Sequence, residues 1–193
     1  MRYLIVCGGK IDKEFGLNEI KTDGIDAIIA ADSGMDFLYE NGVTPDIIVG
    51  DFDSATTKAL EFFERKGQTE IHRLNPIKDD TDTEYAIRLA IREGARSIVL
   101  LGATGSRIDH VLGNISLLGI GLESGTDISI IDTNNRIRMA DKPVTIEKSA
   151  QYGRFVSLIA VTDDNEVSLR GLKYPVTDYS FDRFTSLGIS NEI

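Results

Sequence analysis

Short apolar runs alternate with amphipathic helical patterns over the first 125 residues or so, and this alternation constrains the fold more than any other feature of the chain. The order strand, helix, strand, helix is typical of a parallel sheet covered by helices. The runs that predict strands are Tyr3–Val6, Ala27–Ala30, Ile47–Val49, Thr69–Leu74 and Ser97–Leu101. The patterns that predict helices span residues 34–41, 55–66, 82–93 and 108–122. We therefore predict an α/β domain over residues 1–125.

Local signals support these helices. Thr81 followed by Glu84 is typical of a capping box at a helix start. Glycines stand where three of the helices should end, at Gly42, Gly67 and Gly94. In the last pattern, apolar residues recur at helical spacing: Ile108, Val111, Leu112, Ile115 and Leu122.

The second part of the chain has a different pattern of apolar residues. Its β-rich stretches are Ile128–Ile131, Val144–Ile146, Phe155–Val161 and Val167–Leu169. Turn-forming sequences separate them, at Asn134-Asn135, Asp141-Lys142-Pro143 and Asp163-Asp164-Asn165. No amphipathic helical pattern remains, so we predict a small antiparallel β domain over residues 126–193.

Charge and composition exclude several classes of protein. The 193 residues carry 31 acids against 21 bases, a net charge of −10, which would repel a nucleic acid. Cys7 is the only cysteine, so no internal disulfide can form, as suits a reducing compartment. The apolar stretch at the N-terminus is too short to span a bilayer or to form a signal sequence. We expect a cytoplasmic protein that binds neither nucleic acid nor membrane.

Aspartates follow the ends of four predicted strands. They are Asp32, then Asp51 and Asp53, then Asp79, Asp80 and Asp82, and finally Asp109. The carboxyl ends of parallel strands meet at one edge of a sheet, where ligands bind. Clustered carboxylates need a counter-charge, and Mg²⁺ prefers such oxygen ligands. The sequence therefore predicts a magnesium site at this edge, which would in turn hold phosphates.

A plainer interpretation applies to each acid taken singly, because aspartate is common at helix caps and turns. Asp80 and Ser33 in particular fit caps. Caps alone, however, do not require Asp-x-Asp beside Asp-Asp-x-Asp, and the clustering favours a metal site.

Two glycine turns accompany the acids. Gly8-Gly9-Lys10 follows the first strand, and Gly102-Ala103-Thr104-Gly105 follows the fifth. Glycine allows the backbone to approach a phosphate closely, and a helix start beyond it favours an anion. Neither turn has the spacing of a P-loop. Arg107 lies between the second turn and Asp109, where a guanidinium can bind phosphate with two hydrogen bonds.

These segments together resemble bacterial thiamine pyrophosphokinases in order and spacing. The match covers nearly the whole chain, although this sequence has Ser106 where the family usually has a second glycine. The segments that resemble the family are Ala31–Gly34, Pro45–Ser54, Lys78–Asp82, Gly102–His110, Gly171–Tyr174 and Ser190–Glu192.

The resemblance implies a Rossmann-like α/β catalytic domain, a C-terminal antiparallel β-sandwich domain, and a homodimer with thiamine sites between subunits. It implies that Asp51, Asp53 and Asp82 hold Mg²⁺ and that Asp32, Arg107 and Asp109 complete the catalytic group. The expected ATP contacts are Gly8, Gly9, Ser33, Gly102, Thr104, Gly105 and Arg107. The expected thiamine contacts are Asp109, Tyr174, Ser190 and Asn191.

The activity implied is transfer of a pyrophosphoryl group from ATP to the thiamine hydroxyl, with AMP as the second product. Asp32 or one of the three metal-site aspartates would accept the hydroxyl proton, and the sequence does not choose among them. Two other hypotheses stay open. A phosphatase would use Asp51 as a nucleophile that becomes phosphorylated, and a sensor on the same fold would bind thiamine or nucleotide without turnover.

Overall fold

The computed structural model describes residues 1–52, 57–75 and 80–193. The chain divides into two compact units, Met1–Pro143 and Val144–Ile193, each described by itself. None of the helices in the described part of the chain is long and apolar enough to cross a membrane.

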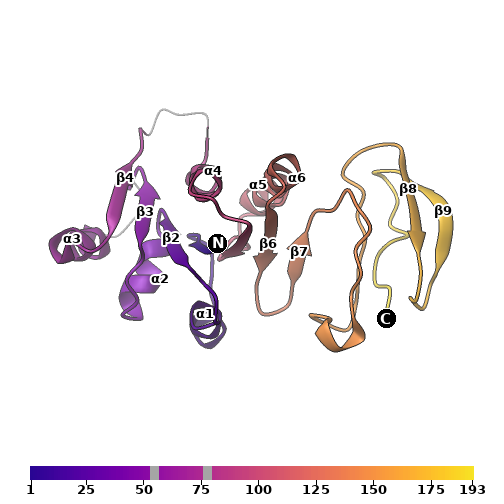
Figure 1. The fold of residues 1–193 in the computed structure, drawn as a ribbon, viewed down its shortest axis with the longest axis horizontal. Helices are drawn as coiled ribbons and strands as arrows, with labels where there is room; N and C mark the ends of the chain where they lie inside the picture. The colour runs from indigo at the N-terminus through magenta and orange to yellow at the C-terminus, as the bar shows by residue number, and fades with distance from the viewer. Residues whose placement is uncertain (53–56, 76–79) are drawn as a thin grey trace. The chain divides into compact units, whose positions relative to one another are not determined.

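Unit 1 is built on a seven-stranded sheet with the order β4-β3-β2-β1-β5-β6-β7 (Figure 1). The first six strands are parallel, and β7 runs antiparallel to β6 at the edge. The bounds are β1 (Arg2–Val6), β2 (Ala27–Ala31), β3 (Ile47–Gly50), β4 (Glu70–Arg73), β5 (Ser97–Leu101), β6 (Asp127–Ile131) and β7 (Arg136–Arg138). All five predicted strands of the first 125 residues are therefore present.

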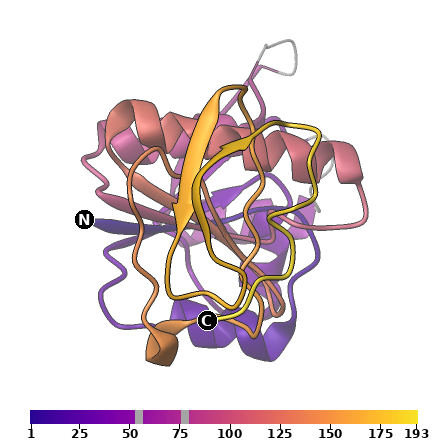
Figure 2. The ribbon, with the colours of Figure 1, turned by 90° about the vertical axis from the view of Figure 1, so that its right-hand side faces the viewer.

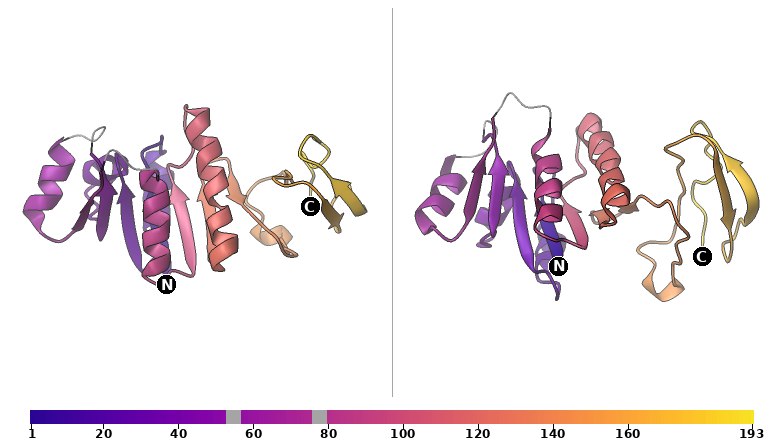
Figure 3. Two further views of the ribbon diagram at one scale, coloured as in Figure 1. Left: turned by 90° about the horizontal axis from the view of Figure 1, so that it is seen from above. Right: turned by 45° about the horizontal axis from the view of Figure 1, so that its top comes forward.

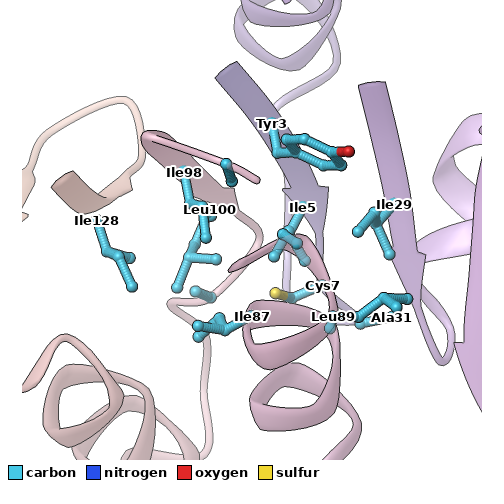
Figure 4. Close-up of a cluster of buried hydrophobic side chains, with 14 of the residues drawn as sticks. Tyr3, Ile5, Cys7, Ile29, Ala31, Ile87, Leu89, Ile98, Leu100 and Ile128 are labelled. Carbon is cyan, nitrogen blue, oxygen red and sulfur yellow. The ribbon is translucent and has the colours of Figure 1, made fainter. Parts of the chain in front are cut away.

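Among the described residues of unit 1, six helices cover both faces of this sheet (Figures 1 and 3). They are α1 (Lys13–Ile20), α2 (Gly34–Glu40), α3 (Thr57–Lys66), α4 (Asp82–Arg92), α5 (Ile108–Leu117) and α6 (Gly119–Ser124). Side chains of β1 point alternately to the two faces: Ile5 packs in the core under α4, α5 and α6, and Leu4 in the core over α1, α2 and α3. Figure 4 shows the first of these cores, with Ile5 and Cys7 among side chains of neighbouring strands and of α4.

The helix signals at Thr81 and at three glycines are confirmed, whereas Ile108 and Leu112 of the apolar face predicted for residues 108–122 are exposed. Thr81 caps α4, because its Oγ1 accepts a hydrogen bond from Glu84 N at 3.2 Å. Gly42, Gly67 and Gly94 follow α2, α3 and α4 in the left-handed conformation that glycine adopts without strain.

Two helices differ from the prediction. The helix predicted over 108–122 is divided into α5 and α6 at Leu118. Helix α1 is absent from the prediction, because Gly16 interrupts its apolar pattern, although Asp12 caps its start by accepting a hydrogen bond from Phe15 N. In the structure this glycine allows close packing, since a Cβ there would lie 2.7 Å from the Phe37 ring.

The compact units of the structure divide between Pro143 and Val144, whereas the sequence analysis places the boundary near residue 125. The run Ile128–Ile131, which was assigned to the antiparallel domain, belongs to β6 and pairs in parallel with β5. Ile130 lies in one core and Ile131 in the other. Burial on both faces is typical of an interior strand of a parallel sheet.

Unit 2 contains the antiparallel pair β8 (Asn165–Leu169) and β9 (Val176–Phe181), shown side by side in Figure 2. A further antiparallel bridge joins Val156 to Asn191. The predicted order, an α/β part followed by an antiparallel β part, is confirmed. The predicted stretch Val144–Ile146 forms no strand, and Phe155–Val161 contributes the bridge at Val156 and a backbone hydrogen bond from Leu158 N to Gly188 O at 2.8 Å. The regular pairing of unit 2 is thus one two-stranded sheet and this bridge.

Candidate active site

The strand order of unit 1 reverses between β1 and β5. From β1 the chain adds β2, β3 and β4 on one side, and then returns to place β5 and β6 on the other. Loops that leave neighbouring strands in opposite directions open a crevice at their carboxyl ends, which is where open α/β sheets bind ligands. The two predicted glycine turns follow β1 and β5 and so lie at this crevice.

Three of the predicted aspartates meet at the same edge. Asp32 follows β2, Asp51 follows β3, and Asp82 is the first residue of α4. One carboxylate oxygen from each lies within 4.8 Å of those of the other two. Because the three residues come from separate segments, the cluster is a product of the fold and not of one local turn.

Asp32 has an unusual backbone conformation and a partly buried carboxyl group. Its φ of 49° is left-handed, a conformation that aspartate and asparagine tolerate better than most residues. Its Oδ1 is buried and has no hydrogen-bond partner among the described residues. Burial raises the pKa of this carboxyl, the nearby Asp82 and Asp51 raise it further, and hydrogen bonds to Ser33 oppose the shift. A buried oxygen without a donor, beside two more carboxylates, fits a divalent cation that prefers oxygen ligands.

This pKa shift predicts a pH dependence for the metal-free protein. A carboxyl whose pKa is raised on folding destabilises the folded state as the pH rises from the ordinary value of 3.8 through the folded-state pKa. The Asp32→Asn variant lacks this effect. Its Tm in EDTA should exceed that of the wild type at neutral pH, and the gain should shrink toward acid pH. Thermal unfolding across the acid range measures both, and a difference independent of pH would contradict the electrostatic origin.

The glycine turns after β1 and β5 are in close contact. Gly9 N donates a hydrogen bond to Gly102 O at 2.9 Å. A Cβ on Gly9 would lie 2.3 Å from Gly102 O and 2.5 Å from Thr104 O, both backbone atoms. On the other side, a Cβ on Gly8 would lie 2.1 Å from Ser33 Oγ. The β1 turn therefore has Ser33, which follows Asp32, on one flank and the second glycine turn on the other.

Arg107 and Asp109 pair with each other at the start of α5. Arg107 Nη2 lies 2.7 Å from Asp109 Oδ2, and both side chains are exposed. The Arg107 guanidinium lowers the pKa of Asp109, assisted by a hydrogen bond involving the backbone of His110. In this conformation the guanidinium is held by its neighbour, and an approaching phosphate would have to compete with that carboxylate.

The three predicted residues of unit 2 lie close together. Tyr174 has an exposed ring, and Ser190 adopts a left-handed φ of 61°. Asn191 is buried, and its side chain holds the backbone of Tyr174 at both ends: Oδ1 accepts from Tyr174 N at 2.9 Å, and Nδ2 donates to Tyr174 O at 2.8 Å. In this structure Asn191 therefore positions Tyr174, which is a role that the sequence did not suggest.

Asp53 lies outside the described residues, as do Lys78 and Asp79.

Asp132 is a further carboxylate at a strand end, and the sequence analysis does not include it. It follows β6 as Asp32 follows β2. The rule that an aspartate after a parallel strand lies at the ligand-binding edge would have included it if Ile128–Ile131 had been predicted as part of the parallel sheet. Its Oδ2 accepts from Thr104 Oγ1 at 2.9 Å, and its Oδ1 from Asn134 N at 2.7 Å. Burial alone would raise the pKa of Asp132, but these and other hydrogen bonds outweigh it and lower the pKa.

Comparison with known proteins gives one consistent result. A family model described as thiamin pyrophosphokinase, catalytic domain, matches residues 21–130, and one described as thiamin pyrophosphokinase, vitamin B1 binding domain, matches residues 143–193. The thiamine pyrophosphokinase of Bacillus subtilis is 35% identical over 167 residues, which cover 86% of this chain and 77% of that protein.

Solved structures agree with the sequence matches. A crystal structure of thiamine pyrophosphokinase from Bacillus subtilis superimposes with a TM-score of 0.87 at 33% identity, covering 100% of this chain and 90% of that one. One from Geobacillus thermodenitrificans gives a TM-score of 0.81 at 30% identity, covering 100% and 88%.

Proposed function

The chain belongs to the thiamine pyrophosphokinase family, and from this premise we propose that it transfers the pyrophosphoryl group of ATP to thiamine at the edge of the unit 1 sheet. The observation that carries this assignment of the site is the meeting of Asp32, Asp51 and Asp82 within 4.8 Å. Three carboxylates on a parallel-sheet edge, beside two glycine turns, suit a site for metal-bound polyphosphate.

Asp51 and Asp82, with Asp53 by resemblance, would hold Mg²⁺, and a carboxylate oxygen of Asp32 lies within 4.8 Å of theirs. When bound, the cation would neutralise phosphate oxygens and the charge that develops during transfer. The carboxylates by themselves would repel ATP, so their close approach makes sense as a metal site and not as a direct phosphate contact.

The remaining residues bind and orient the substrates. The backbone of the Gly8-Gly9 and Gly102–Gly105 turns would lie against the phosphates, together with Ser33 and Arg107. The thiamine hydroxyl oxygen attacks the β-phosphorus, the bond from that phosphorus to the α-phosphate bridging oxygen breaks, and AMP leaves. A carboxylate of the cluster or Asp53 accepts the hydroxyl proton. Such a transfer depends on alignment and charge neutralisation more than on covalent participation of the protein.

Asp109, Tyr174, Ser190 and Asn191 form the proposed thiamine contacts, with Asn191 acting through the backbone of Tyr174. From the family resemblance we also propose a homodimer with thiamine sites between subunits and a cytoplasmic location.

Incubation of the purified protein with ATP, Mg²⁺ and thiamine, followed by chromatography, tests the reaction. We expect AMP and thiamine diphosphate in equal amounts, formed only when thiamine is present. Phosphorylation of the protein with release of inorganic phosphate would support the phosphatase hypothesis instead. Tight thiamine binding without turnover would support the sensor hypothesis.

The Tyr174→Ala variant should raise the KM for thiamine by about 10-fold with a smaller effect on kcat, because ring contacts bind the ground state as well as the transition state. Asn191→Ala, which removes both hydrogen bonds to the Tyr174 backbone, should raise the same KM. Steady-state kinetics of the single and double variants measure the coupling. The double variant should have a KM close to that of Tyr174→Ala, and fully additive increases would contradict the positioning role of Asn191.

A further inference from the structure

The first turn of α4 carries Asp82, and this turn is less buried than the rest of the helix. Residues Asp82–Tyr85 are only half-buried. The buried residues of α4, which pack in the core on this face of the sheet, come after them: Ala86, Ile87, Leu89 and Ala90. The core therefore fixes the body of α4, while the position of its first turn depends more on polar contacts.

Tyr85, at the end of this turn, contacts His72 on β4. The Nδ1 atom of His72 lies 3.2 Å from the hydroxyl oxygen of Tyr85, and the two rings pack edge to face with centroids 6.0 Å apart. The Nε2 atom of His72 lies 2.6 Å from Oε1 of Glu70 on the same strand. These three side chains connect the edge strand of the sheet to α4, and we call them the β4–α4 clamp.

The β4–α4 clamp has a defined order of donors and acceptors. A carboxylate only accepts hydrogen bonds, so Nε2 of His72 donates to Glu70. In the neutral imidazole Nδ1 then carries no proton and accepts from the Tyr85 hydroxyl. Glu70 thereby orients the ring of His72 toward Tyr85.

A second contact joins the same turn to β1. Thr83 Oγ1 lies 3.7 Å from the sulfur of Cys7, the residue before Gly8. Burial raises the pKa of the Cys7 thiol to about 11, so the sulfur is a neutral thiol at neutral pH and accepts only a weak hydrogen bond. We therefore expect the hydrogen bond to His72 to contribute more to the position of the turn.

The position of Tyr85 determines that of Asp82, because residues three apart lie on the same face of a helix. One carboxylate oxygen each from Asp82, Asp32 and Asp51 lies within 4.8 Å of the others. Mg²⁺ requires near-octahedral geometry with short ligand distances, whereas Ca²⁺ accepts a more flexible arrangement. A small shift of the Asp82 carboxylate should therefore weaken the binding of Mg²⁺ more than that of Ca²⁺.

We propose that His72 and Tyr85 are positioning residues that set the place of the Asp82 carboxylate and so favour Mg²⁺ over Ca²⁺ at the three-carboxylate cluster. The inference rests on the proposed function, in which Asp82 binds the metal. Neither His72 nor Tyr85 has a role in the site predicted from the sequence.

Competition for Mn²⁺ tests the proposal without turnover. The electron paramagnetic resonance signal of free Mn²⁺ gives the amount bound, and added Mg²⁺ or Ca²⁺ displaces it. Tyr85→Phe keeps the ring that contacts His72 and Arg92 and removes only the hydroxyl. It should weaken Mg²⁺ binding by about 3-fold to 10-fold, the range that one lost hydrogen bond allows, and Ca²⁺ binding by less than about 2-fold.

His72 offers a matched pair of substitutions. Asparagine can place its Oδ1 near the position of Nδ1 and still accept from Tyr85, so His72→Asn should keep the Mg²⁺ affinity within about 2-fold. His72→Leu has no acceptor and should weaken Mg²⁺ binding as much as Tyr85→Phe, and the double variant should weaken it no further. Tyr39→Phe, which removes a hydroxyl near the end of α2, is the control and should change neither affinity. Thermal unfolding in EDTA checks that each variant is folded.

Three results would overturn the positioning role. An unchanged Mg²⁺ affinity in both Tyr85→Phe and His72→Leu would show that the β4–α4 clamp does not position Asp82. Equal losses of Mg²⁺ and Ca²⁺ affinity would show that it does not act on ligand geometry. Absence of Mn²⁺ binding by the wild type would remove the metal site itself. Failure of the proposed function is measured separately, as the absence of AMP formation from ATP and thiamine, and the binding experiment needs neither substrate.

Discussion

The Asp51→Asn variant is expected to lose about 100-fold or more in kcat, because it removes a charged metal ligand worth roughly 3 kcal/mol of transition-state stabilisation. Asp51 follows β3, and one of its carboxylate oxygens lies within 4.8 Å of oxygens of Asp32 and Asp82. Asparagine has nearly the same size and keeps one oxygen, so the change isolates the charge. Initial rates of AMP formation at saturating ATP, thiamine and Mg²⁺ measure the effect.

A loss of folding should not explain this result. The substitution relieves repulsion among three carboxylates, so the variant without metal should be at least as stable as the wild type. Asp23→Asn makes the same chemical change at the opposite edge of the sheet, in the loop between α1 and β2, and should retain full activity. Turnover of Asp51→Asn near the wild-type rate would exclude Asp51 as a metal ligand.

The Gly34→Ala variant is expected to lose about 3 kcal/mol of folding free energy or more, with a fall in Tm on the order of 10 °C. A Cβ at Gly34 would lie 1.9 Å from Val6 O and 2.6 Å from Val6 C. Both atoms belong to the backbone of β1, the central strand, so neither can move without shifting the sheet. The contact brings the start of α2 against β1, and it thereby places Ser33 beside the Gly8 turn.

Gly113→Ala is the matched control, since it also replaces a helical glycine by alanine. A Cβ at Gly113 would meet nothing within 4 Å. Alanine favours a helix interior over glycine by about 1 kcal/mol, so this variant should be as stable as the wild type or more so. Thermal unfolding of both variants measures the difference, and equal Tm values would mean that α2 does not pack on β1 as described.

The strands and the acid cluster of the first part were predictable because their signals are local. A short apolar run predicts a buried strand, and the residue after it lies at the carboxyl edge wherever the sheet is parallel. Asp32, Asp51 and Asp82 could therefore be placed together without knowledge of the strand order. The order itself depends on contacts between distant segments.

The errors have a physical origin as well. Ile128–Ile131 has the same apolar composition whether it pairs in parallel or antiparallel, and only its partner β5 decides. The sequence does not predict β9, because its side chains are mostly exposed and apolar and polar residues do not alternate along it. The role of Asn191 depends on a contact with Tyr174, 17 residues away, which no pattern in the sequence indicates.

Diffraction from crystals grown with Mn²⁺ and a non-hydrolysable ATP analogue, measured for the anomalous signal of manganese, would test the central claim most directly. We expect an anomalous peak coordinated by Asp51 and Asp82 and next to Asp32, on the side of the Gly8-Gly9 turn. A strong peak elsewhere in the protein, with no signal among these three carboxylates, would contradict the assignment of the sheet edge as the metal and phosphate site.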